Sequence, residues 1–225
     1  MALQDRAIRT KRQLLEGAAA VFNRRGYDAA TIQEILDESG LTKGSLYYHF
    51  ESKEELAVAV MKEQVVDIKV APQSSKLQEF VDAGQALAHQ LRDDVLQQAA
   101  ARMSTEQASQ HLDRTESMGA WTNFVIGLLT EARARGELLV SVDIQQTAEM
   151  YVGAFAGLQM MSQAVSGRQD LSNRLRIFFS HTMPSIATPT ALAQLDLSCK
   201  RGAEVAKVAA KQLAVDRAMV AKEDA

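Results

Sequence analysis

Residues 31–56 constrain the fold more than any other segment, because several helix start and stop signals fall close together in TIQEILDESGLTKGSLYYHFESKEEL. Thr31 and Ser52 each stand three residues before a glutamate, which is the capping-box pattern that begins a helix. Gly40 ends the first helix, and Thr42 begins the next. The segment therefore predicts a helix, a tight turn, a short second helix and a firmly capped third one.

The rest of the chain also has the pattern of helices. It contains three prolines and 12 glycines, lacks strict polar–apolar alternation, and repeats apolar residues at intervals of three and four. We predict an all-α fold with helices at residues 7–25, 31–39, 42–49, 53–70, 76–92, 93–109, 116–135, 143–166, 171–183 and 189–213. We expect the tail from about residue 214 to 225 to fray, because it has no clear apolar stripe.

The first three helices have the pattern of a helix-turn-helix DNA-binding domain, in which the second helix of the motif lies in the major groove. The expected buried stripe of the first helix consists of Ile8, Leu14, Leu15, Ala18, Ala19, Val21 and Phe22. The apolar underside of the motif would consist of Ile32, Ile35, Leu41, Leu46 and Phe50. The alternative is a small helical hairpin whose polar face is merely solvated.

The exposed face of the short helix offers hydrogen-bond donors for DNA. Lysine can donate to guanine O6 and N7, and serine and threonine can serve bases or phosphates. Tyrosine and histidine at the helix end suit phosphates, and Gly44 allows close approach to the DNA. With Lys53 at a helix start that attracts phosphate, the predicted DNA-binding residues are Arg6, Arg9, Thr31, Thr42, Lys43, Gly44, Ser45, Tyr47, His49 and Lys53.

Local charge favours this interpretation although the total does not. The formal net charge is −3, but the first twelve residues hold four basic residues, Arg6, Arg9, Lys11 and Arg12, against the single acid Asp5. A phosphate backbone responds to the local potential, so a mildly acidic total does not exclude DNA.

Several other classes of protein are disfavoured. The one cysteine, Cys199, excludes an intramolecular disulfide and any multi-cysteine zinc site. We see no apolar signal-peptide core and no run of about 18 apolar residues, so we expect a cytoplasmic protein without membrane contact. The groups that resemble an acid–base or metal set are His89, Asp93, Asp94 and His111, and they lack metal-ligand spacing. We predict no catalytic residue, no metal and no cofactor.

The chain resembles the TetR family of bacterial repressors. The shared pattern is Phe22, Arg25-Gly26-Tyr27, Ala30-Thr31, Glu34-Ile35, the run from Gly40 to Phe50, and Lys53-Glu54-Glu55-Leu56. In the Tyr-x-His-Phe part of the run, this chain has Tyr48 where γ-butyrolactone autoregulator receptors, a narrower group within the family, often have Phe, and we expect that position to be packed. The resemblance implies residues 1–52 as a helix-turn-helix domain and residues 53–225 as a larger helical domain for ligand binding and dimerisation.

A narrower resemblance is to the γ-butyrolactone autoregulator receptors of Streptomyces-type actinomycetes. It rests on residues 4–10, Glu63-Gln64, the segments around Tyr151-Val152-Gly153 and Phe155-Ala156-Gly157, and residues 192–197. It implies a repressor of antibiotic biosynthesis that leaves a palindromic operator when a small diffusible lactone or butenolide binds. Relatives that respond to antibiotics, or a DNA-binding dimer that needs no ligand, remain alternatives.

The larger domain has the composition of a helical bundle with a ligand site. Its methionines are numerous and adapt to irregular space, although for any one of them core packing is the simpler explanation. The resemblance implies that Trp121 is a wall of the lactone site, and helical spacing adds neighbours. The predicted ligand-binding residues are Gln64, Trp121, Phe124, Val125, Phe155 and Gln159.

We expect a homodimer formed by the helices near 143–166 and 171–197. Small residues, Gly153, Ala154, Ala156 and Gly157, allow close helix approach. Leu175, Phe178, Phe179 and Ile186 offer apolar area, unless they pack within the protomer. The helix from Lys53 towards Gln64 would then link ligand to DNA.

Overall fold

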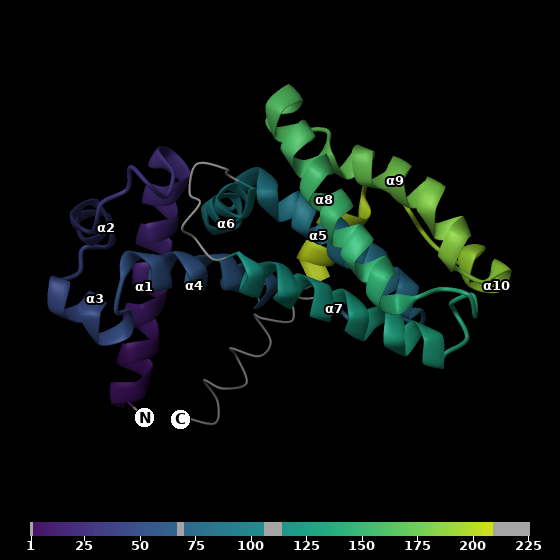
Figure 1. The fold of residues 1–225 in the computed structure, drawn as a ribbon, viewed down its shortest axis with the longest axis horizontal. Helices are drawn as coiled ribbons and strands as arrows, with labels where there is room; N and C mark the ends of the chain where they lie inside the picture. Colours follow the sequence, from purple (N-terminus) through teal and green to yellow (C-terminus); the bar gives the residue numbers. More distant parts are fainter. Residues whose placement is uncertain (1, 67–69, 106–113, 209–225) are drawn as a thin grey trace. The chain divides into compact units, whose positions relative to one another are not determined.

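The computed structural model describes residues 2–66, 70–105 and 114–208. These residues form ten named helices, and the prediction of an all-α fold is confirmed (Figure 1). The helices are α1 (Ala2–Arg25), α2 (Ile32–Ser39), α3 (Lys43–His49), α4 (Lys53–Val66), α5 (Lys76–Asp93), α6 (Val95–Thr105), α7 (Thr115–Ala134), α8 (Ile144–Ser166), α9 (Leu171–Ile186) and α10 (Pro189–Leu192). Within the described residues, the one isolated β-bridge pairs Leu138 with Ala187.

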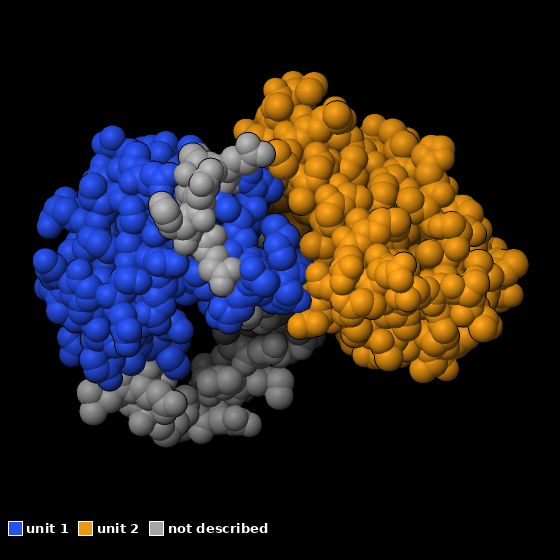
Figure 2. All heavy atoms as spheres, in the orientation of Figure 1, with its two compact units in different colours: residues 1–67, 93–121 blue, residues 68–92, 122–225 orange. Residues whose placement is uncertain are grey.

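The chain divides into two compact units (Figure 2). The first unit comprises residues 1–67 and 93–121, and the second comprises residues 68–92 and 122–225. The first unit therefore includes α4, α6 and the first turns of α7 in addition to residues 1–52. Trp121 and Thr122, which are adjacent within α7, fall in different units.

The core of the first unit forms where α1 packs against α2, α4 and α6. The expected stripe of α1 is buried from Leu14 to Phe22, but Ile8 is 61% exposed, so its assignment to the core was wrong. The reason is that the buried part of α1 begins at Leu14, so Ile8 lies nearly two turns before the contacts with the core. The underside of the motif packs as predicted, with Ile35, Leu46 and Phe50 buried.

Two glycines end helices in the first unit as the sequence predicts. Gly26 has φ 78° after α1, and its amide donates to the carbonyl of Phe22 at 2.8 Å. Gly40 has φ 66° after α2, and its amide donates to the carbonyl of Leu36. Other residues are strained in this left-handed conformation, so glycine makes both sharp exits possible.

Helices α8 and α9 of the second unit lie side by side (Figure 1). Aromatic side chains of α5, α8 and α9 form a core in this unit. The ring of Tyr151 lies edge-on to those of Phe80 and Phe178, with centroids 4.9 and 5.2 Å away. Burial raises the pKa of Tyr151 to about 12, and the nearby hydroxyl of Thr182 opposes the rise. The buried carboxylate of Glu137 caps α5 by accepting from the amide of Leu77 at 2.8 Å and from that of the preceding residue.

The predicted helix at 189–213 is wrong, because α10 ends at Leu192 and a separate helical segment begins at residue 201. The chain after α10 forms hydrogen bonds with α5 instead. Gln78 pairs with the backbone of Asp196, donating at 3.0 Å and accepting at 2.8 Å. Arg201 forms a two-point ion pair with the fully buried Asp82, and its Nε contact is 2.8 Å.

The other helix bounds differ by smaller amounts. Helix α4 is described to Val66, short of the predicted end at residue 70, and α6 runs from Val95 to Thr105 within the predicted 93–109. Helix α9 continues through Pro184 to Ile186, because the proline falls in the last turn and the amide of Ala187 still bonds to Met183. The expected tail at 214–225 lies outside the described residues.

Candidate nucleic-acid interface

The start of α2 is held by a reciprocal cap. The hydroxyl of Thr31 accepts from the amide of Glu34 at 3.2 Å, and the backbone amide of Thr31 donates to the Glu34 carboxylate at 3.0 Å. The amide of Thr31 and its hydroxyl, at 2.9 Å, both donate to the Glu34 carboxylate, and with Arg25 2.8 Å away they lower the pKa of Glu34. The cap fixes the point at which the chain enters the helix-turn-helix.

Helix α3 presents a polar face over a buried underside. Thr42 caps the helix by accepting from the amide of Ser45 at 3.2 Å. Lys43, Gly44 and Tyr47 are exposed, and the Lys43 ammonium lies 5.9 Å from the centre of the Tyr47 ring. A donor-rich face thus projects outward from a helix that Leu46 holds in the core.

The lack of a side chain at Gly44 is not required by the fold. A Cβ atom placed there would have its closest protein neighbour, the hydroxyl oxygen of Thr42, 3.9 Å away. Glycine in a helix costs about 1 kcal/mol relative to alanine. The position is therefore open on the outside, where an external partner can approach the backbone.

Tyr48 is 79% exposed, so our expectation that it is packed was wrong. Leu46 and Phe50 occupy the inner face four residues apart, which leaves the position between them on the opposite side. That spacing was available in the sequence and predicts exposure. The ring of Tyr48 stands edge-on to that of the half-buried His49, with centroids 4.9 Å apart.

Lys53 does not present its ammonium to the outside. The ammonium donates to the carbonyls of Tyr27 at 2.9 Å and Ala30 at 3.0 Å, with a longer 3.5 Å contact to Asp28. It also lies 4.4 Å from the centre of the Tyr27 ring. Three ammonium protons are thereby directed at the turn between α1 and α2, and Lys53 joins that turn to the start of α4.

The predicted arm residues lie on the first turns of α1. Arg6 and Arg9 are both exposed. The hydroxyl of Thr10 donates to the carbonyl of Arg6 at 2.9 Å, one turn back along the helix. The arm is helical in this part and presents basic side chains to solvent.

The residues predicted to bind ligand have varied environments. Val125 and Gln159 are buried, whereas Trp121, Phe124 and Phe155 are half-buried. The side chain of Gln64 lies outside the described residues. The methionines are divided between the core, where Met61 and Met103 are buried, and the surface.

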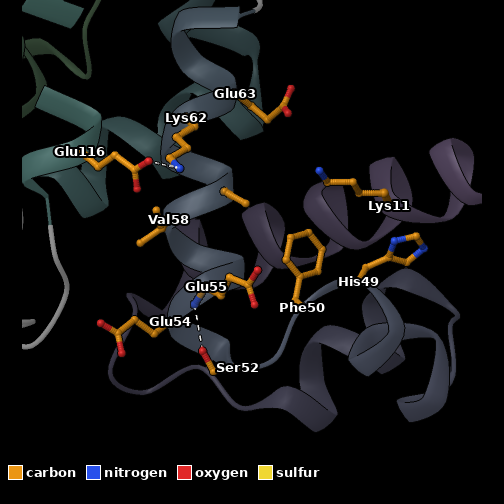
Figure 3. Close-up of a pocket in the computed structure, with 11 residues that line it drawn as sticks. Lys11, His49, Phe50, Ser52, Glu54, Glu55, Val58, Lys62, Glu63 and Glu116 are labelled. Atoms are coloured by element: carbon orange, nitrogen blue, oxygen red, sulfur yellow. Dashed lines mark hydrogen bonds and ion pairs between the residues drawn. The ribbon is translucent and has the colours of Figure 1, made fainter. Parts of the chain in front are cut away.

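A cleft of about 500 Å³ lies within the first unit. Figure 3 shows Lys11 and His49 on one side of it, and Lys62 beside Glu116 on the other. Lys62 and Glu116 form an ion pair, and the carboxylate of Glu55 accepts from the amide of Glu51 at 2.6 Å. Of the residues predicted to bind ligand, Trp121, Phe124, Val125, Phe155 and Gln159 do not line this cleft, and the side chain of Gln64 is not described.

The outer face of α8 carries exposed apolar side chains, and α9 adds one. Leu175, Phe179 and Ile186 are buried within the protomer, so these three do not supply the expected dimer surface. Five other apolar side chains are exposed instead, namely Met150, Met160, Met161, Val165 and Ile177. Gly153 and Gly157 are also exposed, with no atom within 4 Å of an added Cβ.

Among the described residues, no helix is long and apolar enough to cross a membrane. None of their histidine, cysteine, aspartate and glutamate side chains gather into a group of three or more that could hold a metal ion.

Comparison with known proteins gives consistent matches. Residues 14–60 match the family model described as bacterial regulatory proteins, tetR family. The A-factor receptor protein of Streptomyces griseus is 38% identical over 195 residues, covering 87% of this chain and 70% of that protein. The crystal structure of full-length native TylP, a TetR regulator from Streptomyces fradiae, is 40% identical with a TM-score of 0.86, covering 92% of this chain and 93% of that one.

A further solved structure, described as a molecular basis for control of antibiotic production by bacterial hormones, is 30% identical with a TM-score of 0.69. It covers 80% of this chain and 99% of its own. Both structural similarities extend well beyond the helix-turn-helix.

Proposed function

The chain belongs to the TetR family of bacterial regulatory proteins, and from that premise we propose that it represses transcription by binding a palindromic operator and is released by a small signal molecule. The observation that carries the proposal is the donor-bearing outer face of α3 above a fully packed underside. The relatives are named as regulators and receptors, and we propose no catalytic activity. Because its target is the chromosome, the protein acts in the cytoplasm.

We propose that Lys43 and Ser45 approach the bases, with Gly44 giving the backbone room to come close. Tyr47 and His49 suit phosphates at the end of the helix. Thr31 and Thr42 lie at two helix starts, where free backbone amides attract phosphate. The remaining predicted contacts are the basic arm residues Arg6 and Arg9.

We assign Lys53 to positioning rather than to phosphate binding. Its ammonium is committed to the carbonyls of Tyr27 and Ala30. It therefore supports DNA binding by holding the entry to α2 against the start of α4.

The signal we propose is a γ-butyrolactone or butenolide, and the response controls secondary metabolism. The support is similarity to the A-factor receptor protein and to a structure concerned with hormone control of antibiotic production. Phe124, Val125, Phe155 and Gln159 supply apolar surface and one amide in the second unit, which suits a small ligand with one polar end. Trp121 remains a proposal from the sequence resemblance, and Gln64 remains one from its position on the fourth helix. An antibiotic or another small molecule is the alternative signal.

We propose a homodimer through the apolar face of α8 and α9. Contact with a second protomer would bury the exposed side chains of Met160, Met161 and Val165. Gly153 and Gly157 permit the close approach of a helix from that protomer. A dimer binds two half-sites whose separation is fixed by the DNA helical repeat. A ligand that changes that separation by favouring another conformation releases the operator, and a hundredfold loss of affinity needs about 2.7 kcal/mol of coupling.

The test is operator retardation. The purified protein should retard a palindromic fragment selected from genomic DNA, and a γ-butyrolactone-containing extract should reverse it. Trp121→Ala should retain retardation and lose the reversal. If no selected fragment is retarded, the repressor proposal is wrong. If the extract releases Trp121→Ala from the operator as it releases the wild type, Trp121 is not part of the ligand site.

A further inference from the structure

Arg168 lies at the turn between α8 and α9 and is 8% exposed. Its guanidinium makes one hydrogen bond among the described residues, a 3.4 Å contact from Nη2 to Oε1 of Gln159, and its Nε has no partner. No carboxylate of the described residues forms an ion pair with it. Burial alone lowers the pKa of Arg168, with no opposing charge. A guanidinium is always charged at ordinary pH, so a buried one without a carboxylate is costly.

The neighbouring acid is already occupied. Asp170 accepts from Nε of Arg174 at 2.7 Å and from the hydroxyls of Ser162 and Ser166. The nearest carboxylate in sequence is therefore satisfied by other donors, and the cation of Arg168 is left without compensation.

The backbone does not explain an arginine at this position. Arg168 has φ 69° and is the one residue other than glycine with positive φ in the described parts of the chain. Glycine or asparagine adopts this conformation at lower cost. Strain and an uncompensated charge at one residue indicate a role for the side chain, because such features persist where function requires them.

We propose that Arg168 and Gln159 form a carboxylate-binding subsite in the second unit, so that the form of the proposed lactone signal that binds there is the hydrolysed one, which carries a carboxylate. The inference rests on the proposed function in taking the second unit to be the one that binds the signal. Arginine presents a planar pair of N–H donors that matches a carboxylate. The uncharged Gln159 leaves that carboxylate without a competing anion.

The subsite distinguishes two forms of one signal molecule. A closed γ-lactone is neutral, whereas its hydrolysed form is a 4-hydroxy acid with an ionised carboxylate. The free guanidinium favours the acid, and an apolar tail would suit the aromatic and aliphatic side chains of the unit.

The experiment compares sodium octanoate, octanamide and γ-octalactone at constant ionic strength on the full-length protein. Titration calorimetry and the melting temperature are the readouts. Octanoate should bind and raise the melting temperature, octanamide should do neither, and Arg168→Gln should weaken octanoate binding at least about tenfold, since a hydrogen bond to a charged group is lost. Equal effects of octanoate and octanamide, or unchanged octanoate binding by Arg168→Gln, would overturn the proposal.

A second variant separates ligand binding from a structural role. Arg168→Gly removes both the buried charge and the backbone strain, so the free protein should melt at the same or a higher temperature while octanoate binding is lost. A lower melting temperature of the ligand-free Arg168→Gly protein would assign Arg168 to structure and overturn the subsite. Operator retardation by the wild type is measured in parallel. Retardation of the operator without octanoate binding would contradict the proposed subsite alone. Octanoate binding without retardation would contradict the proposed repressor function alone.

Discussion

Replacing Lys53 by methionine tests whether this residue holds the domain together or neutralises a phosphate. The substitution keeps most of the aliphatic stem and removes the ammonium. That ammonium makes two good hydrogen bonds, to the carbonyls of Tyr27 and Ala30 at 2.9 and 3.0 Å, and lies over the Tyr27 ring. Hydrogen bonds to charged groups contribute about 1.5–3 kcal/mol each. Because Lys53 is half-buried and water can reach the freed carbonyls, we take a total loss of about 2–3 kcal/mol, from the low end of that range.

The assay has two parts. For a chain of this size, each kcal/mol shifts the melting temperature by about 2–4 °C, so Lys53→Met should melt about 4–12 °C lower than the wild type. Operator affinity is then measured at several salt concentrations, below the melting transition. Loss of one phosphate contact in each protomer would reduce the salt slope by about 1.8 for a dimer. Because the Lys53 ammonium is directed inward, we expect the slope to stay unchanged.

Lys43→Met is the matched control, because Lys43 is an exposed lysine on α3 whose ammonium lies near the Tyr47 ring and makes no hydrogen bond to the described residues. It should keep the melting temperature and weaken operator binding. A Lys53→Met protein with the wild-type melting temperature and a reduced salt slope would refute the positioning role and restore Lys53 to the phosphate contacts.

Three further substitutions test other features. Gly44→Ala should leave the melting temperature unchanged or raised, because the added Cβ meets no protein atom closer than 3.9 Å, yet lower operator affinity by about tenfold or more, or some 1.4 kcal/mol; equal affinity in retardation assays would mean that DNA does not approach this point. Gly202→Ala should destabilise the fold by about 1–3 kcal/mol, because its Cβ would lie 2.3 Å from the Gln85 carbonyl oxygen, and an unchanged urea midpoint would show that the segment yields easily. Arg174, with Ser162 and Ser166, lowers the pKa of Asp170, so Asp170→Asn should melt below the wild type at neutral pH, with a difference that shrinks as the pH falls below about 4. A difference that stays constant from pH 7 to pH 3 would contradict that assignment.

The helix-turn-helix could be predicted closely because its signals are local. The caps at Thr31 and Thr42 and the left-handed Gly40 act within a few residues of themselves, so sequence spacing is sufficient to find them. The apolar positions of α2 and α3 likewise follow from helical periodicity. The prediction that Tyr48 is packed followed the family pattern, whereas helical periodicity places this residue on the exposed side.

The C-terminal region could not be predicted in this way, because its conformation depends on distant partners. Apolar spacing after Pro189 is compatible with one long helix, but Gln78 and Asp82 on α5 bind Asp196 and Arg201 from more than a hundred residues away. Buried polar pairs of this kind satisfy groups that a continuous helix would leave unpaired. The same holds for Arg168, because nothing in its sequence neighbourhood indicates burial of a charged side chain.

The division of the chain points to a second helix, besides α4, that connects the two units. The sequence suggested α4 as the link, running from Lys53 towards Gln64. In the structure, the first turns of α7 belong to the same compact unit as α1, α4 and α6, and Lys62 of α4 pairs with Glu116 of α7. Helix α7 continues without a break from Trp121 into the second unit, where Phe124 and Val125 lie. A helix transmits displacement along its axis because its backbone bonds are internal. We therefore propose α7, in addition to α4, as an element that connects a ligand of the second unit with the DNA-binding unit.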